Sequence, residues 1–310
     1  MPLRGLFAAL VLAVACGRAI AADVVGYSEA FDTLYRVDFT TLTADEIGRA
    51  TIIGAPRWAN IEGLTASPSG VLYGISDTAT VKTLLRIDPT TGLATSLGAL
   101  SLTGGDTSGQ LDLSLAFTCD GRFWMSSGTG LFWQIDLTTT AVTFVGNLGA
   151  KITGLAARGN VLYGIGSQGD NNLYTIDLTT GAATLVGAFG SSVPYITTIS
   201  AAFDAAGNLH AILDFNPSPS GSTITQWNDL AQITSTSGVL ADMGNITASG
   251  NSDADLEFIG MKGLAIFPSA CAAQAATVSL PILSWQSLFI LIALLILFAG
   301  MQFSRRYPAI

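Results

Sequence analysis

Few residues of this chain have side chains that could perform catalysis. His210 is the only histidine, so any Ser-His-Asp triad would have to use it. Internal copies of the same sequence pattern carry Tyr73, Trp124 and Tyr163 at the matching position. We therefore interpret His210 as a substitute for a packed aromatic residue, and we predict no catalytic residue.

Two segments are rich in the oxygen atoms that hard cations such as Ca²⁺ prefer. Asp253, Asp255 and Glu257 alternate along one segment, and Asp170-Asn171-Asn172 forms the other. Neither has the spacing of a calcium loop, so solvated loops are the favoured interpretation and the first three residues are weak candidate metal ligands. His and Cys do not cluster, which excludes an ordinary zinc site. We expect no cofactor, with calcium as the one alternative.

A repeated motif organises the middle of the chain. Four segments end in Asp-x-Thr-Thr, and each is followed by a short apolar segment that ends in Gly, at 51–54 in the first copy. A degenerate fifth copy is expected at 225–229. An Asp in a tight turn accepts hydrogen bonds from backbone N–H groups two or three residues on. The four aspartates are therefore predicted to be turn caps rather than catalytic acids: Asp38, Asp88, Asp136 and Asp177.

A second element precedes each motif, so that one unit contains four short strands. From Leu64 to Leu264 the units follow a period of about fifty residues, which is typical of β-propeller blades. The N-terminal unit lacks its first strand, and a matching segment appears at 261–267. We predict an all-β propeller of five blades with four antiparallel strands each, closed by a composite blade from both ends of the chain. Six blades remain an alternative if 99–111 or 245–255 contains further strands.

The first strand of each blade should line the central channel. The position two residues before the repeated Leu carries a different residue in each of the five copies. The polar residues at this position are our candidates for channel-lining binding residues: Glu62, Thr153, Ser200 and Lys262, with Leu113 in the remaining copy. Such variation indicates either a binding site or mere tolerance of solvent, and tolerance is favoured. Glu62 and Lys262 belong to adjacent blades, so we expect an ion pair between them.

Two cysteines, Cys119 and Cys271, lie outside the N-terminal segment that we predict below to be a cleaved signal peptide. The predicted blades that carry them are not neighbours, and a disulfide needs Cα atoms within about 7 Å. We therefore predict no disulfide.

Both ends of the chain carry targeting signals. Arg4, an apolar run and Ala19-Ile20-Ala21 predict a signal peptide over residues 1–22, with a lipoprotein Cys16 as an alternative. At the other end, an uncharged segment between Trp285 and the Arg305-Arg306 pair predicts a transmembrane helix at 282–304. The ectodomain would be 23–270, the linker with its sorting motif 271–281, and the cytoplasmic tail 305–310.

The run Leu280-Pro281-Ile282-Leu283-Ser284-Trp285, followed by the apolar segment and the Arg pair, resembles the IPTL-CTERM sorting signal of Gram-negative bacteria. That pattern reads roughly Ile-Pro-Thr-Leu-Ser-Glu-Trp; here Ile282 replaces the Thr, and no acidic residue precedes Trp285. The resemblance implies export in a Gram-negative bacterium, membrane tethering and a sorting protease as partner. The repeats also resemble exported bacterial β-propeller-repeat proteins, a resemblance that implies no activity. The sorting-motif residues are Leu280, Pro281, Ser284, Trp285, Arg305 and Arg306.

The net charge of −9 repels phosphate backbones, so we expect no nucleic-acid partner. We predict a membrane-tethered binding module for protein or glycan, in the periplasm or at the cell surface. The alternatives are a hydrolase or lactonase-like propeller enzyme that uses carboxylates or a bound cation, and a structural component of the envelope. Carboxylates around an open metal position would favour the enzyme, whereas a closed channel would favour binding by faces and loops.

Overall fold

The computed structural model describes residues 25–30, 32–49, 60–78, 80–191, 193, 195–215, 228–250 and 260–271. The predicted signal peptide, sorting motif, transmembrane helix and cytoplasmic tail lie outside these residues, as do Asp253, Asp255 and Glu257. Within the described ranges, no helix is long and apolar enough to cross a membrane.

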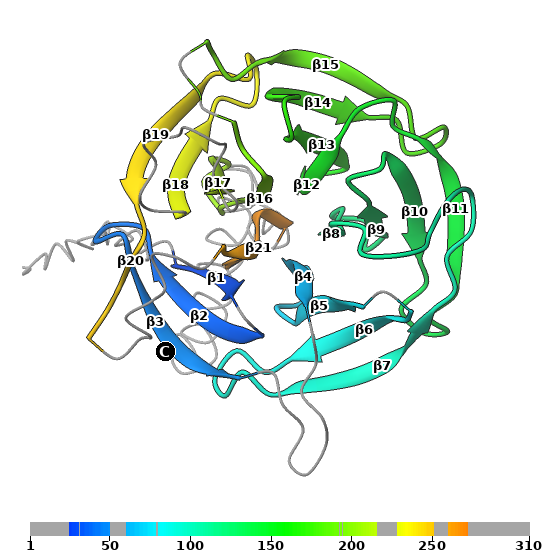
Figure 1. Cartoon of the computed structure of the whole chain (residues 1–310), viewed down its shortest axis with the longest axis horizontal. Helices are drawn as coiled ribbons and strands as arrows, with labels where there is room; N and C mark the ends of the chain where they lie inside the picture. Colours follow the sequence, from blue (N-terminus) through cyan, green and yellow to red (C-terminus); the bar gives the residue numbers. More distant parts are fainter. Residues whose placement is uncertain are drawn as a thin grey trace, which may run out of the picture.

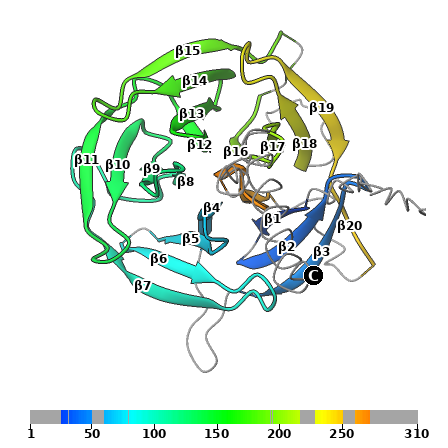
Figure 2. The same cartoon turned by 180° about the vertical axis from the view of Figure 1, so that it is seen from behind.

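Five antiparallel sheets stand around a central axis like the blades of a propeller (Figures 1 and 2). Blade 1 contains β21 (Lys262–Phe267), β1 (Val25–Ala30), β2 (Thr33–Asp38) and β3 (Thr43–Arg49), with the two-residue β20 (Thr247–Ala248) outside them. Blade 2 contains β4 (Ile61–Ala66), β5 (Leu72–Asp77), β6 (Lys82–Ile87) and β7 (Ala94–Leu100). Blade 3 contains β8 (Ser114–Phe117), β9 (Phe123–Ser126), β10 (Leu131–Ile135) and β11 (Val142–Asn147). Blade 4 contains β12 (Ile152–Arg158), β13 (Val161–Gly166), β14 (Asn172–Ile176) and β15 (Ala183–Ala188). Blade 5 contains β16 (Thr198–Phe203), β17 (Leu209–Asp214), β18 (Asn228–Ile233) and β19 (Leu240–Asn245).

The prediction of five blades with four antiparallel strands is confirmed. Of the two segments that could have held a sixth blade, 99–111 contains only the end of β7, and the described part of 245–255 adds only β20.

The composite blade closes the ring as predicted. The C-terminal strand β21 pairs antiparallel with β1, with Ala265 opposite Tyr27. On the outer side, β20 pairs with β3 in the parallel direction. Segments from the far end of the sequence therefore cover both edges of blade 1, which leaves fewer unpaired backbone groups exposed.

The position of a strand within its blade explains its sequence. Inner strands are packed between neighbouring blades on both faces, so β4 and β17 are buried at every residue. The outermost strand β15 contains no fully buried residue, and it mixes Thr and Gly with apolar residues. The apolar runs of the repeat therefore mark inner strands, and the mixed segments mark the rim.

The four repeated aspartates are turn caps, as predicted. In each hairpin, Oδ1 accepts a hydrogen bond from the backbone N–H two residues on, at 2.7–2.8 Å, and these bonds hold the pKa of each Asp below its usual value. For the pKa of Asp88 the hydroxyl of Thr90 contributes most, and for the pKa of Asp38 the backbone N–H of Thr41 contributes most. These carboxylates are therefore already engaged in structural hydrogen bonds.

The structure places two copies of the repeat differently from the prediction. The fifth hairpin turns at Thr234, whose carbonyl accepts the Gly238 N–H at 2.8 Å. Thr stands there in place of Asp, which hid the turn. In the expected copy at 225–229, Asn228 and Asp229 begin β18, and 225–227 lie outside the described residues. In the first copy the outer strand is β3, with Gly48 at the repeated glycine position, whereas 51–54 lies outside the described residues.

The repeated glycine and the repeated turn meet at the rim of the ring. Each glycine in an outer strand lies against the hairpin turn of the next blade, and at Gly146 and Gly187 a side chain would overlap a backbone oxygen of that turn. The pairs are Gly48 with Thr91, Gly98 with Thr140, Gly146 with Thr180, Gly187 with Ser237, and Gly244 with Leu42. We call these five contacts the rim locks; they join every blade to its neighbour.

Candidate functional site

The innermost strands surround the axis in the order β21, β4, β8, β12 and β16, each in contact with the next (Figure 1). Residues at the start of these strands line one cavity, and residues toward their ends line another. We call the face where the inner strands begin the mouth face, and the face where they end the plug face.

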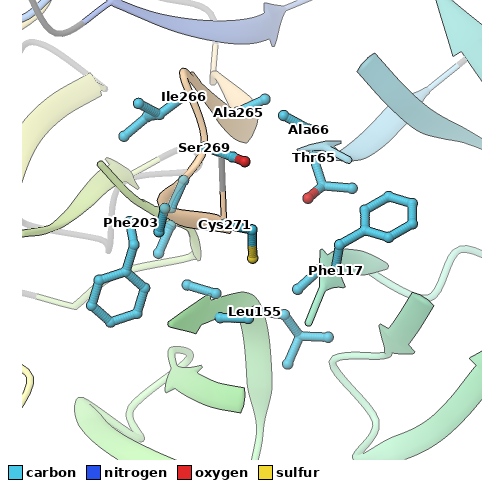
Figure 3. A pocket seen from close by; sticks show the side chains of 15 residues that line it. Thr65, Ala66, Phe117, Leu155, Phe203, Ala265, Ile266, Ser269 and Cys271 are labelled. Carbon is cyan, nitrogen blue, oxygen red and sulfur yellow. The ribbon is translucent and has the colours of Figure 1, made fainter. Parts of the chain in front are cut away.

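The axis is filled at the plug face. After β21 the chain crosses the axis, and Ser269, Ala270 and Cys271 lie among residues contributed by all five inner strands (Figure 3). Only about 40 Å³ of space remains there. Cys271 is bonded to Cys119, which follows β8 in blade 3, with an S–S distance of 2.03 Å and a Cα–Cα distance of 5.0 Å. The channel is therefore closed at this end.

The prediction that these cysteines stay apart was wrong. Its premise holds, because Cys119 follows a strand of blade 3 and Cys271 a strand of blade 1, which are not neighbours. However, Cys271 lies four residues beyond Phe267, the last residue of β21. Near the axis the ends of all inner strands converge, so a segment that crosses it can reach any blade.

At the mouth face the structure brings the predicted channel-lining residues together. Glu62, Thr153, Ser200 and Lys262 all line one cavity of about 10 Å³, which has room for roughly one water molecule. The space is small because these side chains bond to neighbouring inner strands.

Five links join the inner strands in a closed circle. Glu62 Oε2 accepts the Leu113 N–H at 2.8 Å, and Ser114 Oγ accepts the Leu155 N–H at 2.8 Å. Thr153 Oγ1 accepts the Ile199 N–H at 3.1 Å, and Ser200 Oγ accepts the Gly263 N–H at 2.6 Å. Lys262 Nζ completes the circle by donating to Glu62 Oε1 at 2.7 Å. We call this circle the axial ring; its last link confirms the predicted ion pair.

The axial ring gives another explanation for the variation at the axis. The requirement at each blade is a polar group that reaches the next inner strand, and Glu, Thr, Ser or Lys can each meet it. In blade 3 the linking residue is Ser114 and not Leu113, because β8 and β16 pair without the bulge that β4, β12 and β21 contain. A match visible in the sequence could have revealed this: Ser114-Leu115-Ala116-Phe117 aligns with Ser200-Ala201-Ala202-Phe203.

Charge is concentrated at the mouth. Glu62 is only 2% exposed, and its burial raises its pKa to about 7, against the opposing effect of Lys262. Burial also raises the pKa of Glu29 well above its usual value. Burial lowers the pKa of Lys262, but the Glu62 carboxylate outweighs this, so the net shift is upward and the lysine stays charged.

Both oxygens of Glu62 are engaged, which limits its chemistry. Oε1 accepts from Lys262 Nζ and from Asn60 Nδ2 at 2.8 Å, and Oε2 accepts the Leu113 N–H. A general base needs a free oxygen within reach of the substrate proton. The described residues also contain no group of three or more His, Cys, Asp or Glu side chains that could hold a metal ion.

His210 occupies the predicted place of a blade aromatic. It lies opposite Ala202, as Trp124 lies opposite Ala116 and Tyr163 opposite Ala156. Its Nε2 lies 3.0 Å from Asp204 Oδ2, and its ring packs on Phe39 with centroids 4.9 Å apart. His210 is buried, and its described contacts are those of a residue in the core.

A wider concavity, which the sequence does not predict, opens on the mouth face between blades 3 and 4. It encloses about 590 Å³. Three loops line it, and we call it the interblade groove: Thr129, Gly130, Asn147, Gly149, Ala150, Lys151, Gln168, Gly169 and Asp170. Gln168 Nε2 donates to Asp112 Oδ2 at 3.2 Å, and Asp112 lines the axial cavity, so groove and mouth share a wall. Of these residues only Asp170 stands out in the sequence, because the other two loops are distant from it along the chain.

Comparison with known proteins finds one repeat family and several distantly similar structures. Residues 67–214 match a family described as "Repeat of unknown function (DUF6923)". No curated protein sequence matches the chain. Among solved structures, TolB from Acinetobacter baumannii is 14% identical with a TM-score of 0.46, over 79% of this chain and 66% of the TolB chain. A chain of a nidogen/laminin complex is 12% identical with a TM-score of 0.47, over 78% of this chain and 98% of its own length. These similarities assign no ligand or activity to the chain.

Proposed function

We propose that this protein is an exported, membrane-tethered binding module for protein or glycan, and that the ligand binds on the mouth face outside the channel. One observation carries the proposal, namely that the axis is closed at both ends, by the plug at one face and the axial ring at the other. A ligand must then be bound by a face or its loops.

The competing hydrolase or lactonase-like function has less support. It requires a free carboxylate or a bound cation in an open pocket. Two carboxylates line the axial cavity. Both oxygens of Glu62 accept hydrogen bonds from the protein, and Asp112 Oδ2 accepts one from Gln168. A purely structural envelope component would need no concavity of the size of the interblade groove.

The backbone of the mouth-face loops supports the choice of face. Four of the six non-glycine residues with a left-handed φ in the described segments lie there: Asp32, Asn60, Asp112 and Gln168, with φ of 61°, 49°, 49° and 54°. Such conformations are uncommon, although Asn and Asp tolerate them best, and they concentrate at ligand sites.

The position of Cys271 supports the orientation. It is the last described residue and lies at the plug face, so the predicted linker and transmembrane helix follow from that face. The mouth face then points away from the membrane. A disulfide also suits an oxidising compartment such as the periplasm or cell surface.

Phosphatase fusions test the predicted tether. Alkaline phosphatase fused after Cys271 should be active, and the same enzyme fused after Ile310 should be inactive in intact cells. An active fusion at Ile310 would contradict the cytoplasmic tail.

Binding assays test the function. The exported full-length protein, in detergent, is applied to an oligosaccharide array and a peptide array, with calcium and with chelator. Saturable binding that persists in chelator is expected. Calcium-dependent lactone hydrolysis without binding in either array would favour the enzyme.

A further inference from the structure

We propose that the interblade groove is a binding site for a neutral saccharide, with Asp170 as its central hydrogen-bond acceptor. This rests on the proposed function, because it names the class of ligand bound on the mouth face.

The lining of the groove favours hydroxyl groups over apolar side chains. Its residues are Gly, Ala, Thr, Asn, Gln, Lys and Asp, without a single large apolar side chain. Peptide ligands owe most of their affinity to large anchors held in apolar pockets. A saccharide instead presents hydroxyls, each of which can both donate and accept.

Asp170 is held in place for such a contact. Its Oδ1 accepts hydrogen bonds from Asn172 Nδ2 at 2.5 Å and from the Tyr174 hydroxyl at 2.7 Å. Burial and the bond to Asp170 raise the pKa of Tyr174 to about 12, so the hydroxyl is a neutral donor at physiological pH. Oδ2 receives no hydrogen bond from a described residue in the structure. An acceptor whose orientation is already fixed loses less entropy on binding.

The same arrangement disfavours a cation at the Asp170-Asn171-Asn172 tip. A Ca²⁺ site needs several oxygen ligands directed at one point. Around Asp170 Oδ1 the neighbours present an amide N–H and a phenolic O–H, which are donors. The Asp170 carboxylate is therefore placed to accept hydrogen bonds from donor groups.

The other walls supply complementary groups. Asn147 Oδ1 already accepts the Gly149 N–H at 2.8 Å, which leaves the Asn147 amide N–H₂ as a donor. Gln168 uses its Nε2 on Asp112, which leaves Oε1 as an acceptor. The exposed Lys151 adds a positive charge that balances Asp170. In a chain of net charge −9, a groove with one charge of each sign suits an uncharged polyhydroxylated ligand.

The test uses the oligosaccharide array followed by calorimetry with the tightest neutral oligosaccharide, on the exported full-length protein. Asp170→Asn keeps the shape but removes the charge, and should weaken binding about tenfold or more, since a hydrogen bond to a charged group is lost. Asp242→Asn, at an exposed acid on the rim of blade 5, is the matched control and should bind like the wild type. Amide hydrogen exchange at 147–151 and 167–171 should slow in the complex.

The outcomes separate this inference from the proposed function. Saccharide binding that Asp170→Asn leaves intact, with no protection at the groove, places the ligand elsewhere and overturns the inference alone. Binding to the peptide array without saccharide binding also overturns the inference but leaves the binding module standing. Failure of both arrays overturns both.

Discussion

The rim locks and the axial ring join the same five blades in different ways. At the rim, every blade uses a glycine against the neighbour's hairpin turn. At the axis, Glu, Ser, Thr, Ser and Lys make the five links. At Gly48, Gly146 and Gly187 the rim demands close approach to a backbone oxygen, which a side chain would prevent, and at Gly98 and Gly244 the backbone takes a positive φ against a neighbouring side chain. The axis demands only a polar group of suitable reach. A repeated residue therefore marks a steric demand here, and a varied position marks a chemical demand with several solutions.

The largest effect should come from removing β21. A chain that ends at Gly260 loses the strand paired with β1, two axial links and the plug. We expect it to lose cooperative unfolding, measured by calorimetry, because blade 1 is left with an open inner edge. A chain that ends at Cys271 is the control and should unfold cooperatively. An unchanged melting temperature in the shorter chain would show that the rim locks alone hold the ring.

Loss of the disulfide should be next in size. Cys119 and Cys271 are 152 residues apart, and removal of a native disulfide typically costs about 2–5 kcal/mol. We expect the double variant Cys119→Ser/Cys271→Ser to unfold at lower urea concentration than the wild type. The wild type treated with reductant should match the double variant. If peptide mapping of the wild type finds two free thiols, the closed plug face is wrong.

The third effect is a pH dependence set by the axial ring. The pKa of Glu62 is about 7 in the folded chain against 4.5 for a free Glu. Between those values the folded chain retains a proton that the unfolded chain has lost, so stability falls as pH rises from about 4.5 to 7. Glu62→Gln should remove up to about 3 kcal/mol of this decline, with Glu29 contributing its own part.

Urea unfolding at pH 5, 6, 7 and 8 measures this slope. Glu46→Gln, at an exposed position on β3, is the control and should keep the wild-type slope. A Glu62→Gln variant with the same slope as the wild type would mean that the axial carboxylate titrates normally.

The smallest effect concerns one rim lock. Thr140 has a φ of 56° where the equivalent turns in blades 2, 4 and 5 use Gly92, Gly181 and Gly238. Thr140→Gly relieves about 1–2 kcal/mol of left-handed strain but increases the freedom of the unfolded chain by about 0.5–1 kcal/mol. A net gain of about 0.5 kcal/mol is expected from thermal unfolding, and Gly181→Thr should show a loss. A lower melting temperature for Thr140→Gly would contradict the strain at this turn.

The features that could be predicted from the sequence are those that recur in each copy of the repeat. The Asp-x-Thr-Thr turns, the missing first strand and the place of His210 follow from aligning copies, because one turn geometry selects one residue pattern. Where Thr234 replaces Asp, the alignment failed. The Glu62–Lys262 pair was predictable because both lie on adjacent inner strands.

The disulfide and the interblade groove were not predictable in this way. Cys271 leaves its blade and crosses the axis, and nothing in the local sequence encodes that path. The groove combines Asn147, Lys151 and Asp170 from separate loops, and their proximity depends on how two blades stand together. Aligned repeats indicate the structure of a single blade, and they carry no information about the space between two neighbouring blades.

The disulfide also determines how the ring would carry a mechanical load. If residues beyond Cys271 are held by a membrane, a pull on the ectodomain enters the propeller at that cysteine. Without the bridge, tension would peel β21 from β1 one pair at a time, starting at Phe267 opposite Val25. The Cys119–Cys271 bond diverts part of the tension into blade 3 through a covalent link. The strand that closes the ring is thereby shielded from the point at which the chain is pulled.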